Sequence, residues 1–187
     1  MLEELLQQDK TLFLYLNGLG SDSWDAFWLF VTNKWTGSAP VYALLLILSY
    51  IKFGLKKTLL IVLSVGVLIG VTDQLANFFK YGVGRFRPCH DEEINSLMRL
   101  VKSSCGGKYG YFSAHAANSF AVAIFFINVL KKHIRFIWVL LLAWAALVAY
   151  SRIYVGVHFP LDVVTGMLIG STLSWIFYRL MGKLEAR

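Results

Sequence analysis

Charged residues are scarce in this chain of 187 residues, and their scarcity limits what the protein can be. Only 16% of the positions are charged, whereas 57% are hydrophobic, and the mean hydropathy is +0.60. One soluble core of this size cannot bury so much apolar surface. The composition therefore excludes an ordinary soluble domain and predicts an integral membrane protein.

Other features are absent as well. The first residues are acidic and polar, and they lack the basic region that begins a cleavable signal peptide, so the first span is expected to direct insertion. No internal repeat or low-complexity segment is visible, which favours a single membrane domain over residues 1–187. Cysteine is limited to Cys89 and Cys105.

The positive net charge does not indicate a nucleic-acid partner. The charge of +7 comes from 18 Lys and Arg against 11 Asp and Glu. These basic residues fall mainly in the polar breaks between apolar stretches, which is where membrane topology places them. The expected partners are therefore the bilayer and a lipid.

Five apolar stretches approach the length of about 20 residues that a membrane helix needs. They lie at about 38–51, 58–79, 113–130, 134–150 and 161–180. Residues 2–16 and 24–34 are too charged or too short, and within residues 1–36 they are expected as interfacial helices, unless one of them crosses at a tilt. The sequence thus predicts an all-α, polytopic bundle of five to six transmembrane helices.

The charge of the breaks predicts the orientation. By the positive-inside rule, three basic breaks are cytoplasmic. They contain Lys52, Lys56 and Lys57, then Lys131, Lys132 and Arg135, and finally Arg179, Lys183 and Arg187. The acidic N-terminus and the breaks 80–112 and 151–160 then lie outside. The outside breaks nevertheless contain Lys80, Arg85, Arg87 and Arg152, and catalysis is a local reason for basic residues on the disfavoured side.

Three clusters of chemically capable residues fall at the outer ends of the spans, and the predicted topology places all three on one membrane face. They read Lys80-x6-Arg87-Pro88, Ser113-Ala114-His115, and Ser151-Arg152-x5-His158-x3-Asp162.

These residue types suit phosphoryl transfer. Lys80, Arg87 and Arg152 are expected to surround the phosphate oxygens and to stabilise a five-coordinate transition state. Ser113 adds a hydroxyl donor, and the amide of Ala114 lies at the positive end of a helix dipole. Since the cations do what metal ions do elsewhere, no metal or cofactor is expected.

Two histidines are expected to divide the proton transfers. If a helix begins near Pro160, Asp162 can reach back to one ring nitrogen of His158 and leave the other neutral and nucleophilic. His158 would attack phosphorus and form a phosphohistidine. His115 would protonate the leaving alkoxide and later activate the water that hydrolyses the intermediate.

Other residues leave alternatives open. Asp73 and Ser151 are expected to support the site from behind, but a purely structural bond to a neighbouring helix is an equal alternative for Asp73. Cys89 and Cys105 share the outer loop and form either a disulfide or two free thiols. His90, with the acidic residues 91–93, could bind a divalent metal, although a solvated acidic loop is favoured.

The three blocks, in this order, resemble the type 2 phosphatidic acid phosphatase superfamily over roughly residues 58–180. The membrane branch of that superfamily dephosphorylates phosphatidate, phosphatidylglycerophosphate, undecaprenyl diphosphate and lipid A. The resemblance implies a metal-independent lipid phosphatase with nucleophile His158, its partner Asp162 and acid/base His115. It implies the phosphate ligands Lys80, Arg87, Ser113 and Arg152.

One block departs from the family pattern Pro-Ser-Gly-His. Phe112 and Ala114 replace the proline and the glycine, but Ala114 keeps its backbone N–H and so retains an amide for phosphate.

The same resemblance favours a bacterial cytoplasmic membrane with the site on the extracytoplasmic side. Undecaprenyl diphosphate or a phosphate of lipid A is the favoured substrate, ahead of phosphatidylglycerophosphate and phosphatidate. A lipid phosphotransferase would use the same phosphohistidine. A transporter would carry polar residues at mid-span on several helices.

Overall fold

The computed structural model describes residues 1–185, and these residues are predominantly helical, with one isolated β-bridge between Phe86 and Tyr109. The elements are α1 (Leu2–Gly18), α2 (Asp22–Thr32), the π-helical turn η1 (Lys34–Ser38), α3 (Ala39–Val83), the 3-10 turn η2 (Pro88–His90), α4 (Ala114–Leu130), α5 (Ile137–Tyr154) and α6 (Pro160–Glu185). The predicted all-α class is confirmed. Arg187, assigned to the last basic break, lies outside the described residues.

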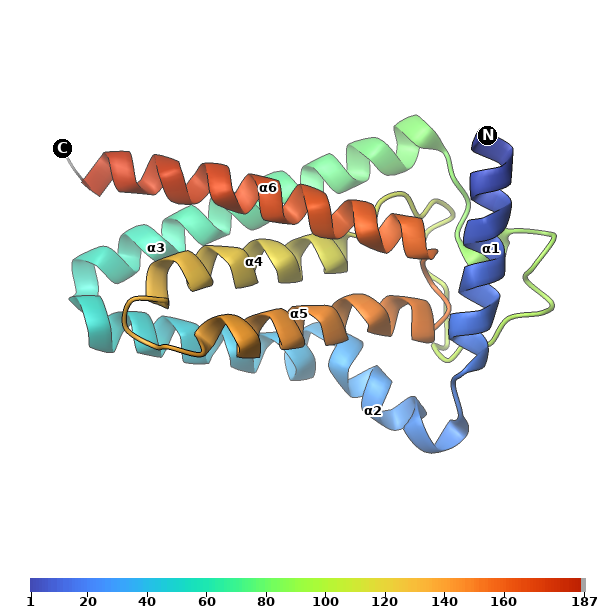
Figure 1. Cartoon of the computed structure of the whole chain (residues 1–187), viewed down its shortest axis with the longest axis horizontal. Helices are drawn as coiled ribbons and strands as arrows, with labels where there is room; N and C mark the ends of the chain where they lie inside the picture. Colours follow the sequence, from blue (N-terminus) through green and yellow to red (C-terminus); the bar gives the residue numbers. More distant parts are fainter. Residues whose placement is uncertain (186–187) are drawn as a thin grey trace.

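Helix α3 is a hairpin of two passes. Gly54 departs from helical geometry with a φ of 72°, a conformation that glycine adopts without steric cost. Figure 1 shows the chain turning back at this end of the bundle, so residues 39–53 and 55–83 run in opposite directions. The sequence predicted a polar break over 52–57. The break is one residue long because the lysines there are good helix formers.

The helices are suited to a bilayer. Within residues 1–185, three helical stretches are long and apolar enough to cross a membrane, namely Lys34–Val83, Ile137–Tyr154 and Pro160–Leu184. Helix α4 is apolar but has only 17 residues. The lipid-facing character of α3 is visible in its exposed side chains Leu44, Ile47, Leu59, Leu63 and Val67. With the hairpin in α3, the multi-span membrane architecture is confirmed.

The α4–α6 crossing is very close. A Cβ placed on Gly170 would lie 2.1 Å from the carbonyl oxygen of Ala117, and one on Gly166 would lie 2.6 Å from that of Ser113. Small residues allow membrane helices to approach in this way. The backbone N–H of Ser113 donates to the carbonyl oxygen of Asp162 at 2.9 Å. The crossing therefore holds the first residues of α4 against the first turn of α6.

The polar segments separate to opposite ends of the bundle (Figure 1). The Gly54 turn, the 131–136 connection and the C-terminal end of α6 lie together at one end. Helix α1, the 84–113 loop and the 155–159 turn lie at the other. This is the separation that the alternating charge predicts, while the side of the membrane that each end faces stays a prediction.

Replacing Gly170 with alanine should weaken the bundle, because the new methyl group meets the α4 backbone. Overpacking of this kind costs about 1–3 kcal/mol, which lowers the unfolding midpoint of a chain of this length by roughly 2–10 °C. Thermal unfolding of the purified protein in detergent measures the change. Gly66→Ala is the matched control, because a Cβ on Gly66 meets nothing within 4 Å. Equal midpoints for the two variants would contradict the packing argument.

Candidate active site

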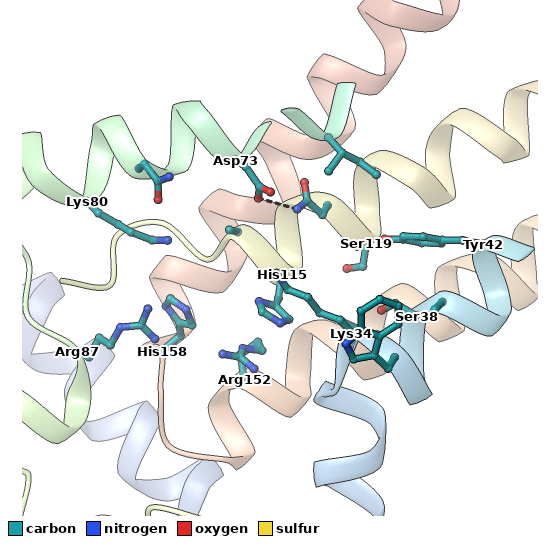
Figure 2. A pocket seen from close by; sticks show the side chains of 17 residues that line it. Lys34, Ser38, Tyr42, Asp73, Lys80, Arg87, His115, Ser119, Arg152 and His158 are labelled. Carbon is teal, nitrogen blue, oxygen red and sulfur yellow. Dashed lines mark hydrogen bonds between the residues drawn. The ribbon is translucent and has the colours of Figure 1, made fainter. Parts of the chain in front are cut away.

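Residues from all three predicted clusters line one cavity of about 560 Å³ near the α1 end of the bundle. The predicted site residues on its wall are Lys80, Arg87, Ala114, His115, Arg152 and His158. Figure 2 shows both imidazoles and the predicted cations Lys80, Arg87 and Arg152 around this common space, from α3, α4, α5 and the two adjoining loops. Side chains that are remote in sequence thus face one possible phosphate position.

His158 lies in the turn between α5 and α6, and only 2% of its surface is exposed. Its Nδ1 is 3.5 Å from Oδ2 of Asp162, which is longer than a formed hydrogen bond. The same carboxylate oxygen accepts from the backbone N–H of Phe159 at 3.1 Å. Catalytic hydrogen bonds often shorten when substrate binds. With Nδ1 beside Asp162, Nε2 is the nitrogen available to a substrate.

The surroundings of His158 keep its ring neutral. Burial is the main cause that lowers the pKa of His158 well below its ordinary value, and the positive charges of Arg87, Arg152 and Lys80 lower it further. A neutral imidazole has the lone pair that nucleophilic attack requires.

Two arginines bring positive charge to the cavity from different elements. Arg87 donates from Nε to the carbonyl oxygen of Tyr109 at 3.2 Å and from Nη1 to that of Val157 at 3.3 Å. Arg152 lies in the last turn of α5, within the segment 151–160 that was expected to be a break, and donates to Oγ1 of Thr32 in α2 at 2.5 Å. Both guanidinium groups are therefore held in place mainly by neutral acceptors.

Arg85 pairs with the predicted site residue Asp162, although the sequence pattern left Arg85 without a role. Its Nη1 lies 2.8 Å from Oδ1 of Asp162, and its Nη2 lies 2.5 Å from Oδ2 of Asp9 in α1. Asp162 is fully buried, and a buried carboxylate needs a cationic partner. The need of Asp162 for a cationic partner was a signal that the sequence offered. The local spacing, however, could not identify Arg85 as that partner.

Two predicted residues lie behind the wall of the cavity. Ser113 is fully buried and caps α4, where its Oγ accepts from the N–H of Ala116 at 3.5 Å. Ser151 donates from Oγ to the carbonyl oxygen of Val148 at 2.6 Å. Neither is among the residues that line the cavity. The phosphate contact predicted for the Ser113 hydroxyl stays a prediction.

The wall of the cavity away from Arg87 is also polar. Asp73 lines it and accepts a hydrogen bond from Nδ2 of Asn118 in α4 at 2.8 Å (Figure 2). Asp73 therefore both faces the cavity and bonds a neighbouring helix. Further lining side chains, which the sequence pattern did not assign, come from Lys34, Trp35, Ser38, Tyr42, Asn77 and Ser119.

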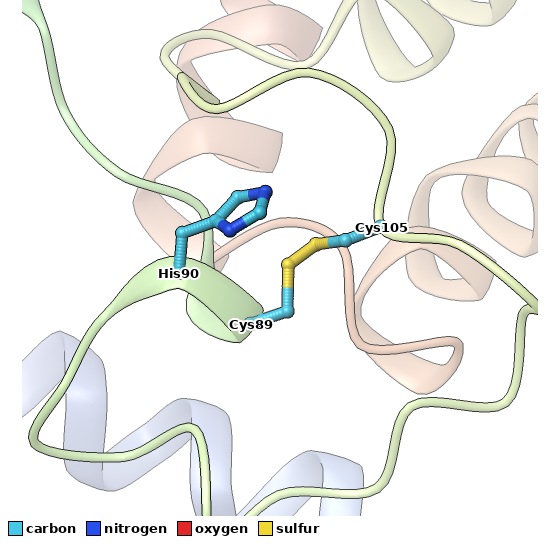
Figure 3. Close-up of side chains that lie close together, drawn as sticks. All are labelled: Cys89, His90 and Cys105. Carbon is cyan, nitrogen blue, oxygen red and sulfur yellow. A yellow bond between two sulfur atoms is a disulfide. The ribbon is translucent and has the colours of Figure 1, made fainter.

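A disulfide between Cys89 and Cys105 closes part of the 84–113 loop (Figure 3). Of the two alternatives for these cysteines, the structure has the bonded one. His90 lies beside the bridge, but oxidised sulfur atoms are not the thiolates that bind metals. The acidic segment beside it is largely exposed, as was favoured, and Lys10 of α1 pairs there with Asp91 at 2.9 Å and with Glu93 at 2.7 Å.

The chain is similar to known phosphatases. Residues 59–186 match the PAP2 superfamily. A lipid A 4'-phosphatase of Bacteroides thetaiotaomicron is 38% identical over 191 residues, which cover 100% of this chain and 83% of that protein. A lipid A 4'-phosphatase of Porphyromonas gingivalis is 35% identical over 181 residues, which cover 95% and 75%. An undecaprenyl-diphosphatase of Sulfolobus acidocaldarius is 34% identical over 137 residues, which cover 73% and 60%.

Solved structures share the fold. The PAP2-type phosphatidylglycerolphosphate phosphatase of Bacillus subtilis superposes with a TM-score of 0.73 at 22% identity, covering 96% of this chain and 87% of that one. Aquifex aeolicus LpxE superposes with a TM-score of 0.67 at 28% identity, covering 90% and 93%. Given the match over residues 59–186 and the relatives that align along nearly the whole chain, this membrane protein belongs to the PAP2 superfamily.

Proposed function

We propose that the protein is a lipid phosphatase that hydrolyses a phosphate ester on a glycolipid of the lipid A type. The observation that carries this proposal is the cavity at one end of a membrane bundle that is lined by two histidines and by the cationic side chains of Lys34, Lys80, Arg87 and Arg152. Acyl chains can stay in the bilayer while the phosphate enters at the interface. The two relatives named lipid A 4'-phosphatases support the substrate class.

The reaction proceeds in two displacements. Nε2 of His158 attacks phosphorus, the bond from phosphorus to the lipid oxygen breaks, and a protonated His115 transfers its proton to the leaving oxygen. The neutral His115 then removes a proton from water, whose oxygen attacks the phosphohistidine. The phosphorus–nitrogen bond breaks, inorganic phosphate leaves, and both imidazoles return to their starting states.

Fixed positive charge stabilises both transition states. Lys80, Arg87 and Arg152 come from three different elements, so together they can surround the equatorial oxygens of the phosphate. Guanidinium groups suit this role because they offer paired donors to two oxygens. Metal ions supply the same charge in other phosphatases. We propose that here the side chains supply it without a metal.

The polar wall of the cavity favours a sugar next to the phosphate. Asp73 presents a carboxylate there, held by the hydrogen bond from Nδ2 of Asn118. Sugar hydroxyl groups can donate to carboxylate oxygens. An isoprenoid chain offers no hydrogen bonds, and it would desolvate this carboxylate without adding a donor. A phosphorylated glycolipid therefore fits this wall better than undecaprenyl diphosphate does.

The orientation follows from charge. The basic segments cluster at the end of the bundle opposite the cavity (Figure 1). The positive-inside rule assigns that end to the cytoplasm. We propose that the protein lies in a bacterial cytoplasmic membrane with its active site on the extracytoplasmic side.

Removal of either histidine should abolish most of the phosphate release from lipid A. We expect His158→Ala to lose more than about 1,000-fold in kcat, as removal of a nucleophile does elsewhere, and His115→Ala to lose about 100- to 10,000-fold. Free phosphate is measured with EDTA present, since the wild type should be indifferent to chelation. His133→Ala, in the 131–136 connection, serves as the control and should keep full activity. Active histidine variants, or a wild type silenced by EDTA, would reject the mechanism.

Asp73→Ala should affect a sugar substrate selectively. The loss of a hydrogen bond to a charged group is worth about 1.5–3 kcal/mol, so kcat/KM for lipid A should fall by roughly 10- to 100-fold. Hydrolysis of phosphatidylglycerophosphate, which presents no sugar ring, should change far less. The ratio of kcat/KM for the two lipids is the measurement. An equal loss on both lipids would show that Asp73 serves the fold and not the sugar.

The pH profile should report the lowered pKa of His158. Since burial and three cations disfavour the imidazolium, His158 stays neutral as the pH falls below the ordinary histidine pKa of 6.5. The nucleophile is lost only when the pH passes through the lower folded-state pKa. The acidic limb of kcat/KM should therefore lie well below pH 6.5. Arg87→Gln removes one cation and should move that limb to higher pH in the residual activity. An acidic limb at or above the ordinary value would contradict the assignment.

A further inference from the structure

Helix α1 lies across the end of the bundle that contains the cavity (Figure 1). Its buried residues are Asp9, Phe13 and Asn17, which are spaced four apart and therefore share one helical face. Leu5 and Leu12 lie on its exposed surface. The helix thus presents a single buried stripe to the rest of the molecule.

Two residues of this stripe, Phe13 and Asn17, contact the segment that carries His158. Nδ2 of Asn17 donates to the carbonyl oxygens of Ile153 at 3.1 Å and Tyr154 at 2.9 Å, just before the 155–159 turn. The ring of Phe13 packs edge-on against Phe159, with centroids 5.3 Å apart. Asn17 and Phe13 of α1 therefore contact the two ends of the 155–159 segment, which contains His158.

The third residue of the stripe, Asp9, is connected through Arg85 to Asp162, the carboxylate beside His158. Its Oδ1 accepts from the N–H of Leu161 at 2.9 Å, and its Oδ2 pairs with Nη2 of Arg85 at 2.5 Å. The other guanidinium nitrogen, Nη1, pairs with Asp162 at 2.8 Å. The guanidinium group also lies over the ring of Phe159, 4.3 Å from its centroid. Arg85 is thereby shared between two buried carboxylates.

This sharing leaves one oxygen of Asp162 facing His158. Arg85 pairs with Oδ1, while Oδ2 accepts from the N–H of Phe159 at 3.1 Å and lies 3.5 Å from Nδ1 of His158. Without Asp9, the guanidinium group could take both oxygens of Asp162 in the bidentate geometry that arginine prefers. The carboxylate oxygen nearest to Nδ1 of His158 would then be turned toward Arg85. Burying a carboxylate at position 9 costs free energy of folding. An apolar residue there would be sufficient if α1 only had to pack against the rest of the protein.

We propose that Asp9 is a positioning residue for the reaction, acting through Arg85 to keep Asp162 aligned with the His158 ring. The proposal rests on the function proposed above, in which His158 is the nucleophile. Asp9 lies outside residues 59–186, the part of the chain that matches the superfamily.

Lys10 provides a control that distinguishes a positioning role of Asp9 from the docking of α1 onto the rest of the protein. Lys10 pairs with Asp91 and Glu93 and so ties the same helix to the 84–113 loop. None of these three side chains lines the cavity. Lys10→Gln removes a docking contact of α1 but leaves the connection from Asp9 to Asp162 in place.

The experiment compares Asp9→Asn, Asp9→Glu and Lys10→Gln in the full-length protein in detergent, with phosphate release from lipid A and from phosphatidylglycerophosphate. We expect Asp9→Asn to lower kcat about 10- to 100-fold, as small misplacements of reacting groups do. KM should stay within about twofold, because the cationic ligands of the phosphate are unchanged. Asp9→Glu restores the charge and should recover part of kcat, and Lys10→Gln should keep kcat within about twofold.

Several results would overturn the proposal. They are an unchanged kcat in Asp9→Asn, an equal loss in Lys10→Gln, or a KM that rises in step with the fall in kcat. Thermal unfolding checks that each variant folds. If Asp9→Asn does not fold, Asp9→Glu is the variant to measure. Its carboxylate is displaced, so kcat should fall while KM stays unchanged. A wild type inactive on both lipids, or a fully active His158→Ala, would instead reject the proposed function, whatever Asp9 does.

Discussion

The close contact between α4 and α6 is the constraint on which the site depends. At Gly166 and Gly170 the α6 backbone approaches α4 so closely that a methyl group would collide with carbonyl oxygens. One consequence is the hydrogen bond from the Ser113 amide to the Asp162 carbonyl, which joins the first residues of the two helices. His115 follows Ser113 by two residues, and His158 lies just before α6. A looser crossing would separate the imidazole expected to transfer protons from the one expected to attack.

The buried charges of this end of the molecule fall into two groups with different surroundings. Arg85 lies between the carboxylates of Asp9 and Asp162, so its charge is compensated within the protein. Arg87 and Arg152 instead donate to carbonyl and hydroxyl oxygens, which orient the guanidinium groups without neutralising them. A cavity with uncompensated positive charge attracts an anion strongly, because few water dipoles remain to screen it. One small region of the protein therefore contains both a guanidinium group that is paired with carboxylates and two guanidinium groups that are not.

Much of this arrangement could be predicted from the sequence, because it depends on short spacings. The interval from His158 to Asp162 is one helical turn, and the motif residues at the span ends share a membrane face once the basic breaks are assigned. Contacts between distant segments could not be predicted in this way. Asp9 and Arg85 are 76 positions apart, and no local pattern pairs them. The cap that Ser113 forms on α4 was also beyond the pattern, since a serine hydroxyl at this place can cap a helix, bind a ligand or do both.

The Cys89–Cys105 bond closes a covalent ring of residues 89–105 within the loop that follows α3. Disulfides persist where thiols are oxidised and are rare where thiols are kept reduced, so the bond agrees with the orientation proposed above. Arg87 stands two positions before that ring. Closure of the ring therefore restricts the backbone just after Arg87, so that part of the loop is held by a covalent bond as well as by packing.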